Sequence, residues 1–290
     1  YAIKFEKEAE EGKYQYMVTD YPGTIGLRFN FINGGTSGLM SNVKIRKAIS
    51  YSIDREEMID AVYGRYNPAY SYVAPAITFN GSSYRSQVGE VIEDEYNEYV
   101  GDPDKIVALF QEGLDELGVE TPIEDITLTY LTSGSTTEVQ AEREYIQQSL
   151  EETLGLTVEL SVAGDTSLFI ADRNEGNYDF FLGGWYSDYN DPLDFLYTNY
   201  TDAYGMSFGG YSNTDYDALA DQLVGETDMD KRLDIYKQME QILLLDDCAF
   251  APIYYATKQV LLQNWVKDYR TSSFGASAEF IWTYIDGKNQ

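Results

Sequence analysis

Residues 183–192, Gly-Gly-Trp-Tyr-Ser-Asp-Tyr-Asn-Asp-Pro, combine the side chains best suited to hold a ligand. Trp185 and Tyr186 offer rigid apolar walls, and Asp188 and Asp191 offer anionic hydrogen-bond acceptors. The two glycines that open the segment would let the main chain approach a ligand closely. Such a segment suits a ligand with a cationic group. The alternative interpretation is a rigid surface turn in which Asp191 and the proline after it begin the next helix.

Other chemistries are excluded by composition. The chain contains no histidine, which removes the Ser-His-Asp and Cys-His mechanisms and the histidine-based metal motifs. The one cysteine, Cys248, permits neither an internal disulfide nor a thiolate metal cluster, and its apolar surroundings predict a buried thiol. Acidic residues are so abundant that paired carboxylates at the spacing of a glycosidase carry no signal. We therefore expect no metal site and no cofactor.

The charge balance narrows the choice of partners. Lys and Arg number 20 against 49 Asp and Glu, which gives a formal net charge of −29. Such a surface makes nucleic acid and anionic membranes poor partners, because phosphate groups are bound by clustered basic side chains. At 290 residues and 43% hydrophobic content, the chain is long enough for one or two folded domains. It begins at Tyr1 with neither an initiator Met nor the features of a signal peptide, so we expect an excised piece of a longer protein.

The first hundred residues predict a strand, a long helix and an extended excursion. Apolar residues alternate from Thr24 onward, within the predicted strand at 14–33. Helical periodicity then runs from Asn42 to Gly64, with a restart at Asp54, because Asp54 and Glu57 form a capping box. Residues 65–100 lack a sustained period and are typical of a surface excursion.

The middle of the chain predicts a β-α-β unit. Asp102 and Pro103 open a helix that Gly118 closes. Strand, helix and strand patterns follow at residues 126–131, 138–154 and 156–162. Such a unit normally forms a right-handed parallel crossover. After a short helix at 167–174, a further apolar strand at 178–183 leads into the segment 183–192. Open α/β sheets bind ligands at this end of their strands.

The last third predicts two helices and two strands. The helices span residues 214–224 and 228–245, and the strands span 251–255 and 259–262. A tail rich in glycine, serine and aromatic residues runs to Gln290.

Several stretches, taken in order, carry a family pattern. They are Asn42-Val-Lys-Ile-Arg-Lys-Ala-Ile-Ser-Tyr-Ser-Ile-Asp54, Pro68-Ala-Tyr-Ser-Tyr-Val-Ala-Pro75, Gly155-Leu-Thr-Val-Glu-Leu, Tyr178-Asp-Phe-Phe-Leu-Gly-Gly-Trp185, Tyr216-Asp-Ala-Leu, Lys231-Arg-Leu-Asp-Ile-Tyr, Pro252-Ile-Tyr-Tyr and Asn264-Trp-Val. Together they resemble the extracellular solute-binding proteins of bacterial peptide and nickel ABC transporters, family 5. The resemblance covers nearly the whole chain from about Thr24.

The resemblance implies a two-lobed binding protein of α/β class. The chain would supply a periplasmic-binding-protein type II-like lobe with a mixed, largely parallel sheet flanked by helices, plus strands belonging to the second lobe. Residues 1–37 would be a segment of the N-terminal lobe and hinge, and residues 38–251 the C-terminal lobe. Residues 252–290 would return to the N-terminal lobe.

The resemblance also assigns ligand-binding residues. In oligopeptide-binding members, the aspartate three residues after the loop tryptophan holds the peptide's α-ammonium group, and that position is Asp188. Gly184 and Trp185 match the adjacent cleft residues. Leu182 stands where those members carry an arginine, so no charged contact is carried over to that position.

Two aromatic residues complete the expected ligand-binding set. We expect Tyr186 and Tyr255 to form an exposed aromatic patch with Trp185, which marks a cleft that lacks its second wall. Because affinity in a closing protein needs both walls, we expect this chain alone to bind peptide weakly.

The implied function is that of a non-enzymatic substrate-binding component of a bacterial ABC importer. It would be a monomer, located outside the cytoplasm as a lipoprotein or in the periplasm, that captures oligopeptides and delivers them to the permease subunits. The lack of histidine argues against nickel held by imidazole. The alternative is a secreted acid glycosidase or sugar-binding module that uses the same Trp, Tyr and Asp residues.

Overall fold

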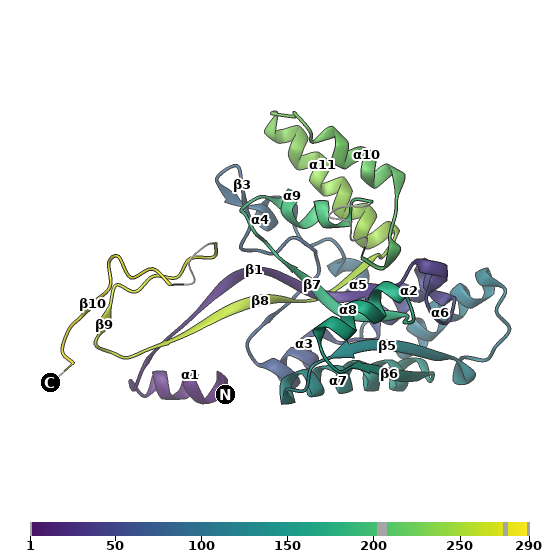
Figure 1. The fold of residues 1–290 in the computed structure, drawn as a ribbon, viewed down its shortest axis with the longest axis horizontal. Helices are drawn as coiled ribbons and strands as arrows, with labels where there is room; N and C mark the ends of the chain where they lie inside the picture. Colours follow the sequence, from purple (N-terminus) through teal and green to yellow (C-terminus); the bar gives the residue numbers. More distant parts are fainter. Residues whose placement is uncertain (1, 202–207, 275–277, 289–290) are drawn as a thin grey trace.

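A six-stranded mixed sheet lies at the centre of the molecule (Figure 1). The computed structural model describes residues 2–201, 208–274 and 278–288. In spatial order the strands are β2 (Asn67–Pro68), β8 (Phe250–Leu262), β1 (Gln15–Phe29), β7 (Phe180–Tyr186), β5 (Thr127–Ser133) and β6 (Thr157–Ala163). β5 runs parallel to β6 and β7, and the other neighbouring pairs are antiparallel. The predicted mixed α/β fold is confirmed, with parallel pairing confined to β7, β5 and β6 rather than dominating the sheet.

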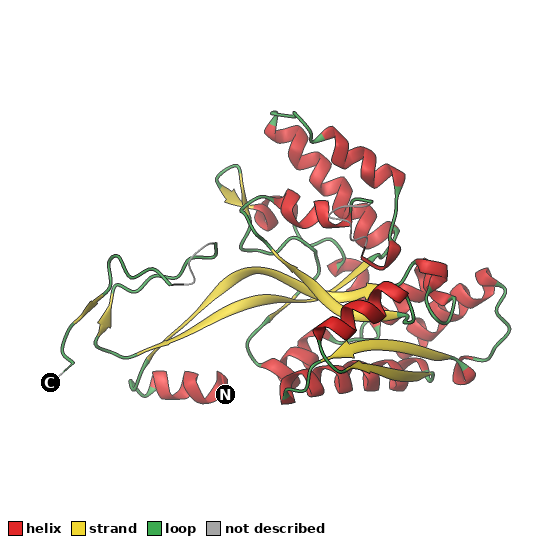
Figure 2. Cartoon of the chain, viewed as in Figure 1, coloured by secondary structure: helices red, strands yellow, loops and turns green. Residues whose placement is uncertain are grey.

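Helices cover both faces of this sheet (Figure 2). One group consists of α2 (Val43–Tyr51), α6 (Pro103–Leu117) and α7 (Thr137–Leu154), and the other of α9 (Pro192–Leu196), α10 (Thr214–Gln222) and α11 (Met229–Gln241). Leu27 and Phe29 of β1 are buried in the core of the first group, whereas Phe250 and Tyr255 of β8 are buried in the core of the second. The sheet therefore separates two apolar cores.

The shorter elements connect these layers. They are α1 (Ala2–Glu10), α3 (Arg55–Met58), β3 (Thr78–Phe79), β4 (Ser82–Ser83), α4 (Tyr84–Val88), α5 (Glu93–Tyr99), α8 (Thr166–Glu175), β9 (Val266–Lys267) and β10 (Tyr284–Ile285). A π-helical turn follows α3 at Ile59–Tyr63 and another follows α11 at Ile242–Asp246. The sequence pattern predicts helices over residues 42–64 and 228–245, and these ranges include the first turn fully and the second up to residue 245.

Several local signals act as the sequence predicts. The Asp54 carboxylate accepts a hydrogen bond from the Glu57 main chain at 3.0 Å and restarts the helix as α3. The Asp102 carboxylate accepts from the Lys105 main chain at 3.2 Å and begins α6, which Gly118 ends in the left-handed conformation. Cys248 is buried, and burial raises the pKa of its thiol to about 11.

β1 and β8 extend beyond the sheet as a two-stranded ribbon. Residues 15–20 of β1 pair with residues 257–262 of β8, at the end where both strands leave the sheet toward α1 and β9 (Figure 1). The two strands predicted at 251–255 and 259–262 are therefore one continuous strand, and β1 begins before the regular alternation at Thr24. Within the described residues, no helix is long and apolar enough to cross a membrane.

Candidate functional site

The loop after β7 is organised by a buried carboxylate, that of Asp194 in the first turn of α9. Asp194 is 1% exposed. Its Oδ2 accepts a hydrogen bond from Trp185 Nε1 at 2.8 Å and another from the Asp188 main-chain N–H at 2.9 Å. One carboxylate therefore fixes both the indole ring and the main chain that carries the candidate ammonium partner.

Asp191 has a structural role. Its side chain accepts a hydrogen bond from the Leu193 main chain at 2.8 Å and begins α9. The Tyr236 hydroxyl donates to the same carboxylate at 2.8 Å, and Arg232 lies 3.7 Å from it. The interpretation of Asp191 as a helix start is thus confirmed, and its carboxylate is already engaged by α11.

Asp188 and Tyr186 are the exposed members of the predicted set. Asp188 is exposed at the start of the loop, and Tyr186 is 48% exposed at the end of β7. The Tyr186 ring lies over Gly23 of β1, where an added Cβ would come within 2.3 Å of the ring. Its centroid is 5.7 Å from that of Tyr21, and partial burial raises the pKa of the Tyr186 hydroxyl.

Trp185 and Tyr255 lie in one row across three strands. Thr24 of β1 is paired with Trp185 on one side and with Tyr255 on the other, and directly paired residues point to the same face. Both aromatic residues pack against the core that contains α9, α10 and α11. Thr24 between them is fully buried, and its hydroxyl has no hydrogen-bond partner among the described residues.

Tyr255 is not part of an exposed patch. It is 4% exposed, and its hydroxyl donates a hydrogen bond to Glu90 Oε2 at 2.6 Å. The expectation of an exposed aromatic patch is therefore wrong at Tyr255, because β8 turns this ring into the core. Tyr189, which is 47% exposed, accompanies Tyr186 at the surface instead.

Gly184 lies so close to the neighbouring strand β1 that no side chain fits at this position. A Cβ at this position would lie 1.9 Å from the main-chain oxygen of Thr24, so β1 itself requires the glycine. Leu182, two residues earlier, is paired with Leu27 and packs against the core of the first helix group. An apolar residue at position 182 therefore fits its surroundings, in agreement with the absence of a charged contact there.

One edge of β7 is only partly paired with another strand among the described residues. β1 pairs with the whole of β7, but β5 pairs only with Phe180 and Phe181 on the other side. In the described structure, the pairing of β7 with another strand on the side that faces away from β1 ends at Phe181. Trp185 and Tyr186 lie beyond this point, and Asp188 follows β7 within two residues.

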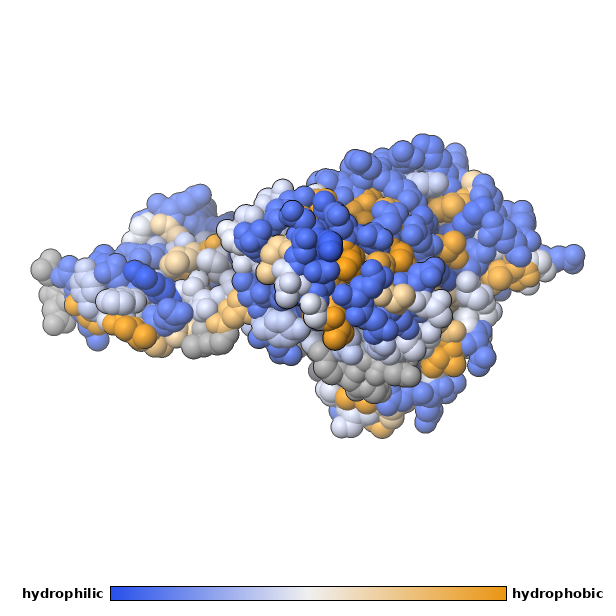
Figure 3. All heavy atoms as spheres, turned by 90° about the horizontal axis from the view of Figure 1, so that it is seen from above, coloured by the Kyte–Doolittle hydropathy of each residue, from blue (hydrophilic) through white to orange (hydrophobic). Residues whose placement is uncertain are grey.

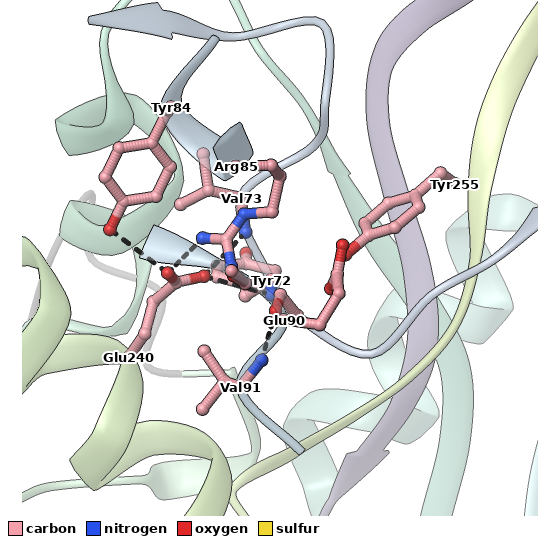
Figure 4. A network of polar contacts seen from close by, with 10 residues as sticks. Tyr72, Val73, Tyr84, Arg85, Glu90, Val91, Glu240 and Tyr255 are labelled. Carbon is pink, nitrogen blue, oxygen red and sulfur yellow. Dashed lines mark hydrogen bonds and ion pairs between the residues drawn. The ribbon is translucent and has the colours of Figure 1, made fainter. Parts of the chain in front are cut away.

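A buried polar network holds the 65–100 excursion in place behind the site (Figure 4). Glu240 of α11 is fully buried and forms an ion pair with Arg85. Its carboxylate also accepts hydrogen bonds from the main chain of Tyr72 at 3.2 Å and of Val73 at 3.0 Å, and from the Tyr84 hydroxyl at 3.1 Å. These contacts of Glu240 tie the excursion to α11.

The same excursion supplies the partner of Tyr255. Figure 4 shows Glu90 reaching from this segment toward the Tyr255 hydroxyl. The neighbouring Val91 main chain donates a hydrogen bond to Ser71 Oγ at 2.8 Å, which fixes the segment at this point. Sequence periodicity missed this arrangement because its bonds join residues far apart in the chain. No cluster of acidic or cysteine side chains within the described ranges could hold a metal ion.

The fold is a mixed sheet with helices on both faces, and the loop after β7 carries side chains suited to bind a ligand. Together these features are typical of an α/β binding lobe. Its family follows from a family model described as "Bacterial extracellular solute-binding proteins, family 5 Middle", which matches residues 2–207. The chain belongs to this family, as the order of its sequence landmarks indicates. These proteins bind solutes and are not enzymes, so the glycosidase alternative is wrong.

Similar proteins include several peptide-binding ones. The dipeptide-binding protein DppE of Bacillus subtilis is 30% identical over 249 residues, which are 85% of this chain and 42% of that protein. The structure of OppA from Listeria monocytogenes bound to peptide is 29% identical, with a TM-score of 0.75 over 97% of this chain and 52% of that one. Heme-binding protein A of Haemophilus influenzae is 27% identical over 85% of this chain and 42% of that protein. The chain thus spans about half the length, or less, of these relatives.

Proposed function

We propose that this chain forms one wall of an extracytoplasmic protein that captures oligopeptides for an ABC importer. The observation that carries the proposal is that no described strand pairs with β7 beyond Phe181 along the edge that faces away from β1. An extended peptide can add to such an edge as a further strand, and its main-chain hydrogen bonds are independent of its sequence. The names of DppE and OppA agree with a peptide ligand.

Asp188 would hold the amino terminus of that peptide. It is exposed, it lies two residues beyond the end of β7, and its main chain is fixed by Asp194. A carboxylate beside the peptide's ammonium group forms a charge-assisted hydrogen bond, which is stronger than a neutral one. Trp185 and Tyr186, on successive positions of the same edge, would contact neighbouring ligand side chains from opposite faces of the sheet.

The second wall would come from the part of the protein to which the ribbon leads. We assign residues 38–251 to the C-terminal lobe, and residues 1–37 and 252–290 to the hinge and the second lobe. The ribbon of β1 and β8 supports this division, because it carries both ends away from the sheet together. Apolar side chains near the C-terminus support it too, since Ile281 is 84% exposed here and would be covered by a second lobe.

The protein would act as a monomer outside the cytoplasm, either anchored as a lipoprotein or free in the periplasm, and would deliver its ligand to the permease subunits. Its description as an extracellular solute-binding family supports this location.

The proposal is tested by native mass spectrometry of the whole protein, purified without denaturation. We expect additional masses that correspond to short peptides, which disappear after unfolding and refolding. Adding trialanine should then restore a single bound mass. Recovery of haem, a sugar or a metal ion in place of peptide, with no binding of trialanine, would overturn the proposal.

A further inference from the structure

The turn at residues 187–191 carries Asp188 and joins β7 to α9. At the start of the turn, the Ser187 main chain donates a hydrogen bond to the Pro22 carbonyl of β1 at 2.7 Å. Nearer its end, the side chain of Asn190 bonds to the hairpin of β3 and β4, at a residue that lies 112 positions away in the sequence. Local turn geometry does not require a contact over such a distance.

Asn190 and Thr78 are joined by a pair of hydrogen bonds. The Thr78 main-chain N–H donates to Asn190 Oδ1 at 2.8 Å, and Asn190 Nδ2 donates to Thr78 Oγ1 at 2.5 Å. Because a main-chain N–H can only donate, the first bond requires the amide oxygen of Asn190 to face it, which leaves the amide nitrogen for the hydroxyl. The pair of bonds therefore fixes both the position and the orientation of the Asn190 side chain.

The hairpin that carries Thr78 has a well-defined backbone. Thr78 of β3 is paired with Ser83 of β4. Asn80 and Gly81 connect the two strands, and both have positive φ angles, 48° and 86°. Positive φ at both central residues is what the type I′ turn of a tight hairpin requires, and Asn-Gly is a preferred sequence for it. Thr78 therefore offers Asn190 a fixed partner.

The hairpin and the turn are also attached to the same residue of α11, Tyr236. Phe79, which follows Thr78, is 6% exposed, and its ring centroid lies 5.5 Å from that of Tyr236 at an interplanar angle of 85°. The Tyr236 hydroxyl donates a hydrogen bond to Asp191, which follows Asn190, at 2.8 Å. The bonds between Asn190 and Thr78 thus close a ring of contacts around Tyr236, which holds the end of the turn in one place.

We propose that Asn190 and Thr78 are positioning residues that hold the turn in the conformation in which Asp188 binds the ammonium group of the ligand. The inference rests on the proposed function. Asp188 is exposed, so the conformation of its turn depends on the contacts of the neighbouring residues. A turn that already has its bound conformation loses little conformational entropy when the ammonium group binds. The benefit is confined to ligands with an ammonium group, because only these contact Asp188.

The test compares trialanine with N-acetyltrialanine, which lacks the ammonium group, by calorimetry of the whole protein. The quantity of interest is the ratio of the two dissociation constants. Asn190→Ala should weaken the binding of trialanine about fivefold or more and leave that of N-acetyltrialanine unchanged, so the ratio should fall by the same factor. A role of Asn190 in the fold alone would weaken the binding of both peptides equally.

Two substitutions of Thr78 test the same bonds from the other side. Thr78→Val removes the hydroxyl that accepts from Asn190 and keeps the shape of the side chain, so the ratio should fall about twofold or more. Thr78→Ser keeps the hydroxyl and should restore the wild-type ratio. The double variant Asn190→Ala, Thr78→Val should have the ratio of Asn190→Ala alone, because both substitutions remove the same interaction.

Asn177→Ala is the matched control, since Asn177 is an exposed asparagine that precedes β7 and bonds only to Glu175 nearby, at 3.4 Å. It should keep the wild-type ratio. If the wild type prefers trialanine but folded Asn190→Ala keeps the same ratio, or binds both peptides equally more weakly, the positioning role is overturned and the proposed function stands. If the wild type binds both peptides equally well, the ammonium role of Asp188 falls, and the positioning role falls with it.

Discussion

Asp194 positions both Trp185 and Asp188, the two residues that we place at the amino terminus of a bound peptide. It accepts hydrogen bonds from the Trp185 indole and from the main chain of Asp188. Asp194→Ala would leave both donors without their partner, so we expect a loss of about 1 to 3 kcal/mol in the free energy of unfolding. Peptide affinity should fall as well, because Asp188 loses its position.

Urea denaturation and calorimetry with trialanine would measure these two effects. Asp194→Asn keeps an acceptor oxygen and should recover most of both losses. If Asp194→Ala binds trialanine as tightly as the wild type, Asp194 has no positioning role.

The sequence could predict part of this site. The composition of residues 183–192 and the family resemblance point to Trp185 and Asp188, and the sequence supports both interpretations of Asp191. Asp194 was missed because an acidic residue in the first turn of a helix is common and indicates no further partner. The burial of Tyr255 depends on the register of β8 against β1, and no local pattern encodes that register.

Glu142 of α7 should make the stability depend on pH. It accepts a hydrogen bond from the Tyr63 hydroxyl, and burial raises its pKa from 4.5 to about 7. The folded protein therefore keeps a proton that the unfolded chain loses between these values, so this group's stabilising contribution falls as pH rises from about 4.5 to about 7. The loss amounts to at most about 3 kcal/mol.

Glu142→Gln should remove this part of the pH dependence and raise stability above pH 7. Denaturant titrations at several pH values between 4 and 8 would measure it, with Glu144→Gln, on the exposed side of the same helix, as the control. An unchanged slope in Glu142→Gln would contradict the assigned pKa.

At the scale of elements, the ion pair between Glu240 and Arg85 joins α11 to the excursion that contains α4. Removing one member of a buried pair leaves an uncompensated charge, so Glu240→Ala should cost about 3 to 5 kcal/mol. Glu112→Ala removes an exposed partner of Lys44 and should cost less than about 1 kcal/mol. Thermal and urea denaturation would compare the two variants. Equal and small losses would show that the excursion does not depend on Glu240.

The sequence predicts those helices and strands whose boundaries and periodicity depend on residues close together in the chain. Asp54, Asp102 and Gly118 mark helix boundaries, and the β-α-β unit at residues 127–163 follows from alternation and helical period. The helices α4 and α5 were missed, since their short segments are held by distant partners such as Glu240. The sequence predicts two strands in place of the single long β8 because Thr257 and Lys258 interrupt the apolar pattern.

At the scale of the whole molecule, α1, β9 and β10 lie beside the main body, beyond the ribbon of β1 and β8, and the view from above shows a smaller mass on this side (Figure 3). One wall leaves much of a bound peptide in water, so we expect the 290-residue chain alone to bind trialanine about tenfold or more weakly than the whole protein. Tryptophan fluorescence titration of both would measure the ratio. Equal affinities would show that this lobe carries the complete site.

The central claim is that Asp188 holds the ammonium group of a peptide that lies along β7. The most direct measurement is calorimetry of the whole protein and its Asp188→Ala variant with trialanine and N-acetyltrialanine. We expect acetylation, and separately the substitution, to weaken binding by about 2 to 5 kcal/mol, because each leaves a buried charge unpaired once the lobes close. Acetylation should cost the variant little. If acetylation costs the wild type nothing, Asp188 is not the ammonium partner and the account is contradicted.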